Sequence, residues 1–259
     1  MFDRLRRLLG LPHSQPTVTD AQWRRVETKL PFLDYLDPVD RPRLRNMALQ
    51  FLASKQFHGA HGFELDDDML LDIALQACLP VLNLGLEAYA GWVGVIVYPG
   101  DFAIPRREYD EAGVVHEYDA DALGEAWDGG PVLLSGVGDG SRADGVNVVI
   151  HEFVHKLDME NGGVDGLPRL RPGMSRQTWA DTFSAAYEVF CDEVDQGLET
   201  RIDPYAAEHP GEFFAVVSEV FFEAPHVLQG RFPQVYEQLV LLYGVNPMLR
   251  ANSPAGGIA

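Results

Sequence analysis

Two histidines four positions apart, with a glutamate directly after the first, are the residues of this chain best suited to chemistry. They are His151, Glu152 and His155, within the stretch VNVVIHEFVHKLDMENG. On a helix the two imidazoles lie about 40° apart and one turn along, so both can bind one metal ion. Glu152 points about 100° to the side, where its carboxylate can exchange a proton with a water molecule beside the ion. The spacing is typical of zinc hydrolases, in which the ion activates water and polarises a carbonyl group.

The apolar residues of the same stretch favour this interpretation over a chance pair of histidines. With His151 at 0°, they fall on one arc between about 160° and 300°. These residues are Val149, Ile150, Phe153, Val154 and Leu157. The histidines therefore lie outside the hydrophobic face of the helix. Asp158 falls beside both histidines, where it could accept an imidazole N–H, but it could equally begin the following loop.

A catalytic zinc ion has three protein ligands and one open position, so a third ligand must come from elsewhere. A third histidine six positions after the second is excluded, because Asn161 stands there. Three glutamates of the segment DPYAAEHPGEFFAVVSEVFFEAP share one helical face within about 40°, namely Glu212, Glu219 and Glu223. They form either a ligand face or a solvent-exposed stripe. Three nearby residues compete with them, and spacing does not decide among Glu208, His209 and His226.

The elements that would position these residues are mostly helices with a few short strands. Apolar residues at helical spacing predict helices after a cap at Thr19 or Asp20. The β-branched runs WVGVIVYPGDF and GPVLLSGVG predict two strands, and residues 109–130 between them predict a surface loop with one strand or turn. Helices return after residue 147, at about 179–197 and through EFFAVVSEVFF. The predicted fold class is α+β, rich in helix, with a small sheet.

Four regions follow from this pattern. Residues 1–18 are a basic leader, and residues 19–90 form an N-terminal helical subdomain packed on the catalytic part. Residues 91–250 form the catalytic domain, and residues 251–259 are a tail.

Composition excludes several classes of function. A net charge of −19 repels phosphate backbones and anionic lipids, so we expect no direct nucleic-acid partner. The most hydrophobic stretch, MLLDIALQACLPVLNLGL, is interrupted by polar residues and predicts a core helix rather than a membrane span. Two cysteines without CxxC spacing favour a reducing compartment. We therefore expect a cytoplasmic protein.

The stretches HEFVHKLDMENG and IDPYAAEHPGEFFAVVSEVFFEAP resemble the MtfA family of zinc metallopeptidases, also called Mlc titration factor A. The similarity extends to GFELDDDMLLDIALQACLPVL, VIVYPGDF and GEAWDGGPVLLS, so it covers most of residues 20–250. The resemblance implies a zincin-like fold of the gluzincin kind, similar to the catalytic domain of lethal-factor toxin proteases. It also implies a cytoplasmic Zn²⁺ aminopeptidase acting on short peptides.

The resemblance assigns a role to each matching residue. His151, His155 and Glu212 would be the metal ligands, and Glu152 would be the catalytic base. Tyr205 of the DPYAA segment would lie near the metal, where a phenol can donate to a developing oxyanion.

Three further histidines are weaker candidates for the site. His116 of VVHEY matches a family position and could occupy the open coordination site as a plug. We expect His58 and His61 of FHGAHG to be loop residues.

Two functions from different classes are compatible with these residues. The first is a zinc peptidase whose strand GPVLLSGVG, at the edge of the sheet, binds an extended peptide by main-chain pairing. The second is a non-catalytic regulatory protein with a structural or regulatory metal. It would sequester a glucose-responsive transcription repressor of the Mlc type, as the family name implies.

Overall fold

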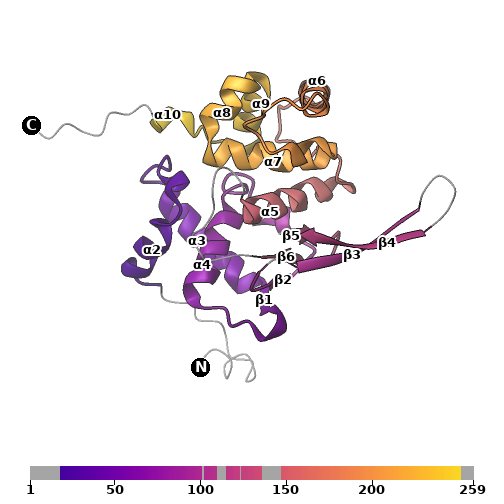
Figure 1. Cartoon of the computed structure of the whole chain (residues 1–259). Helices are drawn as coiled ribbons and strands as arrows, with labels where there is room; N and C mark the ends of the chain where they lie inside the picture. The colour runs from indigo at the N-terminus through magenta and orange to yellow at the C-terminus, as the bar shows by residue number, and fades with distance from the viewer. Residues whose placement is uncertain (1–17, 101, 110–114, 123, 136–146, 252–259) are drawn as a thin grey trace, which may run out of the picture.

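The computed structural model describes the backbone of residues 18–100, 102–109, 115–122, 124–135 and 147–251. Side chains are described for residues 18–100, 124–135 and 147–249. The predicted leader, except for its last residue, and the predicted tail, except for its first, lie outside these ranges. Figure 1 shows the helices and the small sheet. The α-helices are α2 (Asp20–Glu27), α3 (Asp40–Ser54), α4 (Asp67–Cys78), α5 (Val148–Asp158), α6 (Arg176–Asp195), α7 (Pro210–Glu223), α8 (Pro225–Arg231), α9 (Pro233–Tyr243) and α10 (Met248–Ala251). The strands are β1 (Gln56–Gly59), β2 (Gly94–Val97), β3 (Phe102–Tyr109), β4 (Val115–Ala122), β5 (Gly124–Ala126) and β6 (Val132–Leu134).

The helices α2 and α4 begin at side-chain caps, of which the sequence predicted the first. Thr19 caps α2, because its hydroxyl accepts the N–H of Gln22 at 3.3 Å while the Gln22 side chain accepts the N–H of Thr19 at 3.0 Å. Asp66 caps α4 by accepting the N–H of Met69 at 2.8 Å. Trp23 and Val26 of α2 are buried. The hydrophobic stretch of residues 69–86 is a core helix only as far as Cys78, where α4 ends, and it continues as turns. Among the described residues no helix is both long and apolar enough to cross a bilayer.

Four strands form a mixed sheet in the order β1-β2-β6-β5. The strands β1, β2 and β6 are parallel, and β5 runs antiparallel to β6. The strand β6 arises from the GPVLLSGVG run, so the prediction that this run lies at the edge was wrong. It is internal, because the three-residue strand β5 pairs with it and forms the edge. The α+β class with a small sheet is confirmed.

Residues 102–109 and 115–122 form a second, two-stranded sheet. The prediction of a surface loop with one strand or turn over residues 109–130 was therefore wrong in part, because this range contains both β4 and β5. The strands β3 and β4 are antiparallel, from the pair Phe102 and Ala122 to the pair Tyr109 and Val115. Figure 1 shows this hairpin extending away from the rest of the chain. Its sequence is rich in charge and lacks a continuous apolar face, so the usual signal of a half-buried strand is weak.

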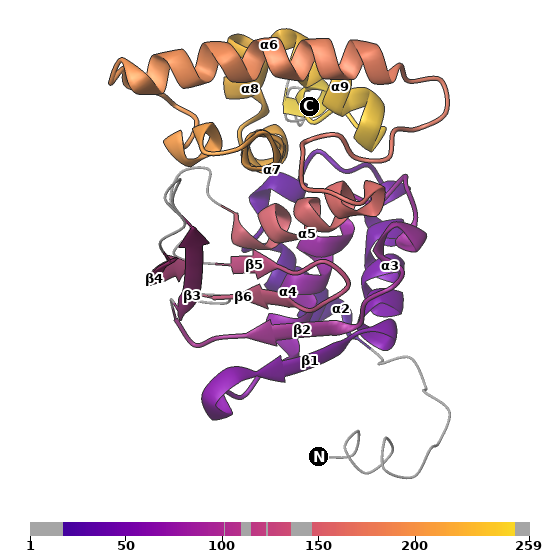
Figure 2. The same cartoon turned by 90° about the vertical axis from the view of Figure 1, so that its right-hand side faces the viewer.

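The helix α5 lies between the sheet and the C-terminal helices, as Figure 2 shows. It contacts β5 and β6 on one side and α7 on the other. Phe153 at its centre packs against three aromatic rings from the N-terminal half, with centroids 5.5 Å away for Phe51, 5.3 Å for Tyr89 and 5.7 Å for Trp92. Burying a side chain of this size contributes about 2 to 3 kcal/mol. These contacts fix the helix that carries the histidine pair.

Candidate metal centre

The helix α5 presents both histidines on the side opposite its core face. Asn147 caps the helix, its side chain accepting the N–H of Ile150 at 3.0 Å. The predicted apolar arc is confirmed, since its members are at most 3% exposed: Val149, Ile150, Phe153, Val154 and Leu157. With that face buried, His151 and His155 point toward α7.

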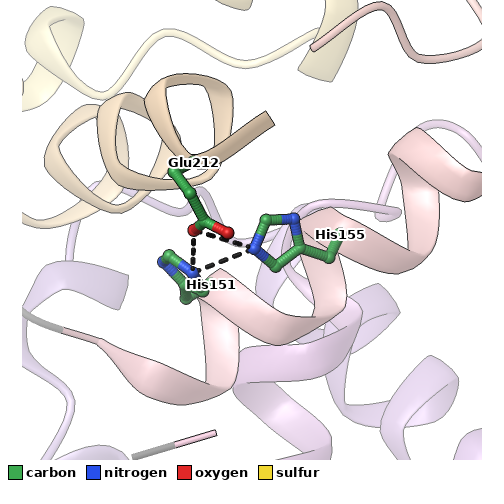
Figure 3. A group of neighbouring side chains, drawn as sticks. All are labelled: His151, His155 and Glu212. Atoms are coloured by element: carbon green, nitrogen blue, oxygen red, sulfur yellow. Dashed lines mark hydrogen bonds and ion pairs between the residues drawn. The ribbon is translucent and has the colours of Figure 1, made fainter. Parts of the chain in front are cut away.

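Three ligand atoms converge between α5 and α7. Nε2 of His151 lies 3.0 Å from Oε2 of Glu212, and Nε2 of His155 lies 3.1 Å from the same oxygen. The two Nε2 atoms lie 3.0 Å apart. Figure 3 shows the three side chains pointing at one another from two helices. They form the one group of this kind among the described residues.

The triangle fits a divalent ion. Zinc bonds of about 2.0–2.1 Å in a tetrahedron separate the ligand atoms by about 3.3 Å, so the observed triangle needs to widen by only a few tenths of an ångström. Hydrogen bonding alone satisfies the group poorly, because two imidazole N–H groups directed at one oxygen crowd each other. A cation accepts a lone pair from all three atoms at once.

The start of α7 places Glu212 at the triangle. His209 caps this helix, its Nδ1 accepting the N–H of Gly211 at 3.1 Å, and Glu212 stands in the first turn. Burial raises the pKa of Glu212, but hydrogen bonds from His151 and His155 outweigh it and hold the pKa well below its usual value. Burial lowers the pKa of His151, and the carboxylates of Glu212 and Glu219 more than reverse this effect. In the metal-free protein, therefore, a proton on His151 occupies a position that a metal ion would take.

Glu152 lies beside the triangle and is 4% exposed. Burial is the main cause that raises its pKa to about 8, with the carboxylates of Glu212 and Glu219 adding to it. Its Oε2 has no hydrogen-bond partner among the described residues. Gly124 of the edge strand β5 lies directly against it, and a Cβ atom at that position would clash with Oε1. Glu152 is therefore desolvated and held where β5 meets α5, which suits a group that exchanges protons.

A buried lysine ties α5 to the turn that follows β5. Lys156, next to His155, donates from Nζ to the carbonyl of Trp127 and, at 2.9 Å, to that of Gly130. Its Nζ also lies 4.9 Å from the centre of the Trp92 ring. Burial lowers the pKa of Lys156 to about 8. These contacts of Lys156 fix the distance between α5 and the edge strand β5. Hydrophobic periodicity in the sequence did not indicate them.

Glu219 is not one of the three convergent residues, and neither is Glu223. Of the two alternatives, the solvent-exposed stripe is excluded for Glu219, which is 3% exposed. Its Oε1 accepts from Nδ1 of His151 at 2.7 Å. Glu223 accepts from the side chain of Asn147 at 2.6 Å.

Asp158 does not bind an imidazole in the described structure. Its Oδ2 accepts the N–H of Gly166 at 2.7 Å, which anchors the loop after α5. Glu208 and His226 are exposed and lie outside the convergent group, as does the capping residue His209.

Of the remaining candidates, Tyr205 lies near the triangle. The ring centre of Tyr205 is 6.1 Å from that of His151, and its side chain is 46% exposed. His116 lies on β4 opposite Glu108, and its side chain is outside the described residues, so its role as a plug stays a prediction. His61 is in a short 3₁₀ helix, whereas His58 lies on β1 rather than in a loop.

Comparisons with known proteins identify the family of this chain. The sequence model of the glucose-regulated metallo-peptidase M90 family matches residues 4–244. Mlc titration factor A of Escherichia fergusonii is 41% identical over 231 residues, which cover 87% of each chain. The protein of the same name from Serratia proteamaculans is 38% identical over 243 residues, covering 92% of each chain, and that from Cronobacter sakazakii is 38% identical over 228 residues, covering 85% of each. The chain therefore belongs to this metallopeptidase family, as its resemblance to the MtfA proteins predicted.

Proposed function

We propose that this protein is a zinc-dependent peptidase with its active site at His151, His155 and Glu212. The observation that carries the proposal is the convergence of two imidazole nitrogens and one carboxylate oxygen within 3.0–3.1 Å of one another. Two histidines and a glutamate are a ligand set of catalytic zinc sites, which keep one further position open for water or substrate. Membership of a metallopeptidase family supports the same reaction class.

Each residue has a distinct part in the proposed hydrolysis. Zinc, when bound, lowers the pKa of water and polarises the scissile carbonyl group. Glu152 takes a proton from the attacking water and delivers it to the leaving amine. The desolvated position of Glu152 favours this exchange, because its raised pKa lies close to neutral pH.

The edge strand β5 is the proposed binding surface for substrate. A peptide can add to its outer edge by main-chain hydrogen bonds, which places the peptide beside Glu152 through the contact at Gly124. We propose an aminopeptidase acting on short peptides, because the MtfA resemblance implies that activity. A cytoplasmic location accords with two free cysteines.

The proposal is tested by removing and restoring the metal. Chelation should abolish cleavage of a panel of free and N-acetylated peptides, and one equivalent of zinc should restore it. Zinc at roughly 1,000 times its Kd should also raise the free energy of unfolding by about 4 kcal/mol, measured by denaturant titration. Full activity in protein shown to be metal-free would sink the proposal. Cleavage of acetylated and free peptides at equal rates would retain a peptidase but reject an aminopeptidase.

Tyr205 is the proposed donor to the oxyanion. Tyr205→Phe should lower kcat by about 10²- to 10³-fold, the usual effect of losing one such donor, while KM and zinc content stay near the parent values. Steady-state kinetics and metal analysis provide the measurement. If the variant loses zinc, or keeps the parent kcat, the phenol has another role.

A second candidate function is the binding of a transcription repressor of the Mlc type. Relatives 38–41% identical to this chain bear the name Mlc titration factor A, and a net charge of −19 suits a basic DNA-binding partner. In this alternative the metal has a structural or regulatory role. A pull-down of purified Mlc with the Glu152→Gln variant separates the two functions. Binding without hydrolysis assigns recognition to another part of the protein, and the absence of binding by zinc-loaded protein rejects this candidate.

A further inference from the structure

The carboxylate of Glu219 is buried against the rear of one histidine. It lies on α7, seven residues after Glu212, and its side chain is 4% exposed. Nδ1 of His151 donates to its Oε1 at 2.7 Å, while Nε2 of the same ring faces the triangle. A carboxylate can only accept, so this bond fixes the proton on Nδ1 and leaves Nε2 as the atom directed at a metal.

Glu219 is itself held at both oxygens. Its Oε2 accepts the backbone N–H of Asn147, at the cap of α5. The side chain of Asn147 donates to Gln76 of α4 at 2.8 Å and to Glu223 of α7 at 2.6 Å. Three helices therefore fix the orientation of this carboxylate. Rotation toward the metal position would leave the Asn147 N–H unpaired in a buried region, which costs about 1 to 3 kcal/mol.

The second histidine has no equivalent support. Nδ1 of His155 is buried and has no partner among the described residues. The nearby carboxylate of Asp158 instead accepts the N–H of Gly166. The two imidazoles therefore differ in their surroundings, because among the described residues a carboxylate accepts from Nδ1 of His151 but not from Nδ1 of His155.

We propose that Glu219 is a positioning residue that orients His151 and strengthens its binding of zinc, and that it is not a ligand. This inference rests on the proposed metal site but not on the reaction performed there. An outer carboxylate makes an imidazole a stronger donor and fixes its tautomer, and loss of such a partner typically weakens metal binding by 10- to 100-fold. Glutamine at this position removes the charge and keeps one acceptor oxygen, which can serve Nδ1–H of His151 or the N–H of Asn147 but not both.

Zinc competition with a chromophoric chelator tests the proposal. Glu219→Gln should weaken zinc binding by about 10- to 100-fold, and Glu219→Asp, which keeps the charge, should lose less. Glu223→Gln is the matched control, because Glu223 lies on the same helix and contacts Asn147 rather than His151. We expect less than about a threefold change for that variant. Equal losses for the Glu219→Gln and Glu223→Gln variants, or no loss for Glu219→Gln, would overturn the proposal.

A second measurement needs no substitution, in case a variant at Glu219 does not fold. Nitrogen NMR of the zinc-loaded parent protein should show His151 with a proton on Nδ1 and the metal on Nε2. Coordination through Nδ1, or an unprotonated Nδ1, would also overturn the proposal. If the parent protein binds no zinc at all, the proposed function itself fails, so the two failures are distinguishable.

Discussion

Replacing Glu152 with glutamine is expected to lower peptide turnover by about 10³-fold and to leave the zinc content unchanged. Glutamine has nearly the same shape and remains buried, but its amide cannot take a proton from water, and general-base catalysis contributes about 10²- to 10⁴-fold. Because Glu152 is not among the three convergent ligand atoms, the metal should remain bound. Steady-state kinetics together with elemental analysis measure both quantities.

The matched control for this variant is Glu160→Gln. Glu160 follows the same helix, is exposed, and pairs with Arg169 at 3.0 Å on the surface. Surface pairs of this kind contribute about 0 to 1 kcal/mol, so turnover should stay at the parent rate. Parent-rate cleavage by Glu152→Gln would mean that another group, or none, acts as the base.

The Glu152→Gln variant should also remove a pH dependence from the stability of the metal-free protein. Burial raises the pKa of Glu152 from 4.5 to about 8, so between these values the folded protein keeps a proton that the unfolded chain has released. The corresponding stability is fully present below pH 4.5 and is lost as pH rises through about 8. At about 1.4 kcal/mol per pKa unit, the loss is on the order of 4 to 5 kcal/mol. Urea unfolding of the metal-free parent protein and of the variant from pH 5 to pH 9 measures this loss. A difference in the free energy of unfolding that stays constant with pH would contradict the raised pKa of Glu152.

The histidine helix was predictable because its information is local. A period of 3.6 residues places His151 and His155 together and the apolar residues opposite, and the structure confirms both faces. The predicted cap at Thr19 depends likewise on a contact three residues away. Such features need no knowledge of the rest of the fold.

The roles of the three glutamates on α7 were not predictable from periodicity. Periodicity gives the angle of a side chain around its own helix, but it does not show which residue of a neighbouring helix that side chain contacts. Glu212, in the first turn, meets the Nε2 atoms of both histidines. Glu219, two turns later, meets Nδ1 of His151. The family resemblance singled out Glu212, whereas the crossing of α5 and α7 gives Glu219 its separate function.

The close approach of Gly124 to Glu152 left no mark in the sequence. Nothing in GEAWDGG shows that the first glycine lies against a residue 28 positions later. The strands β3 and β4 were not predicted as a pair, because their charged sequences resemble a loop. Local patterns therefore predict elements with a clear apolar face, but neither charged strands nor the contacts between elements.

Replacing Glu212 with glutamine is expected to weaken zinc binding by more than about 100-fold, because loss of an outer partner alone costs 10- to 100-fold and Glu212 is a proposed direct ligand. An amide is a poorer donor and removes the charge that balances the ion. Turnover at trace zinc should fall with occupancy, and excess zinc should restore only part of it. Zinc competition measures affinity, and kinetics as a function of zinc concentration separate occupancy from catalysis.

Glu208→Gln provides the control for this result. Glu208 lies four residues before Glu212, is exposed, and is outside the convergent group. Its replacement should leave zinc affinity and turnover within about twofold of the parent, since surface substitutions usually change stability by less than about 0.5 kcal/mol. If the Glu208 variant loses zinc and the Glu212 variant does not, the third ligand comes from the turn before α7. The substrate would then also lie differently relative to Glu152. The positions of the three ligands determine which coordination position of the ion stays open for the substrate.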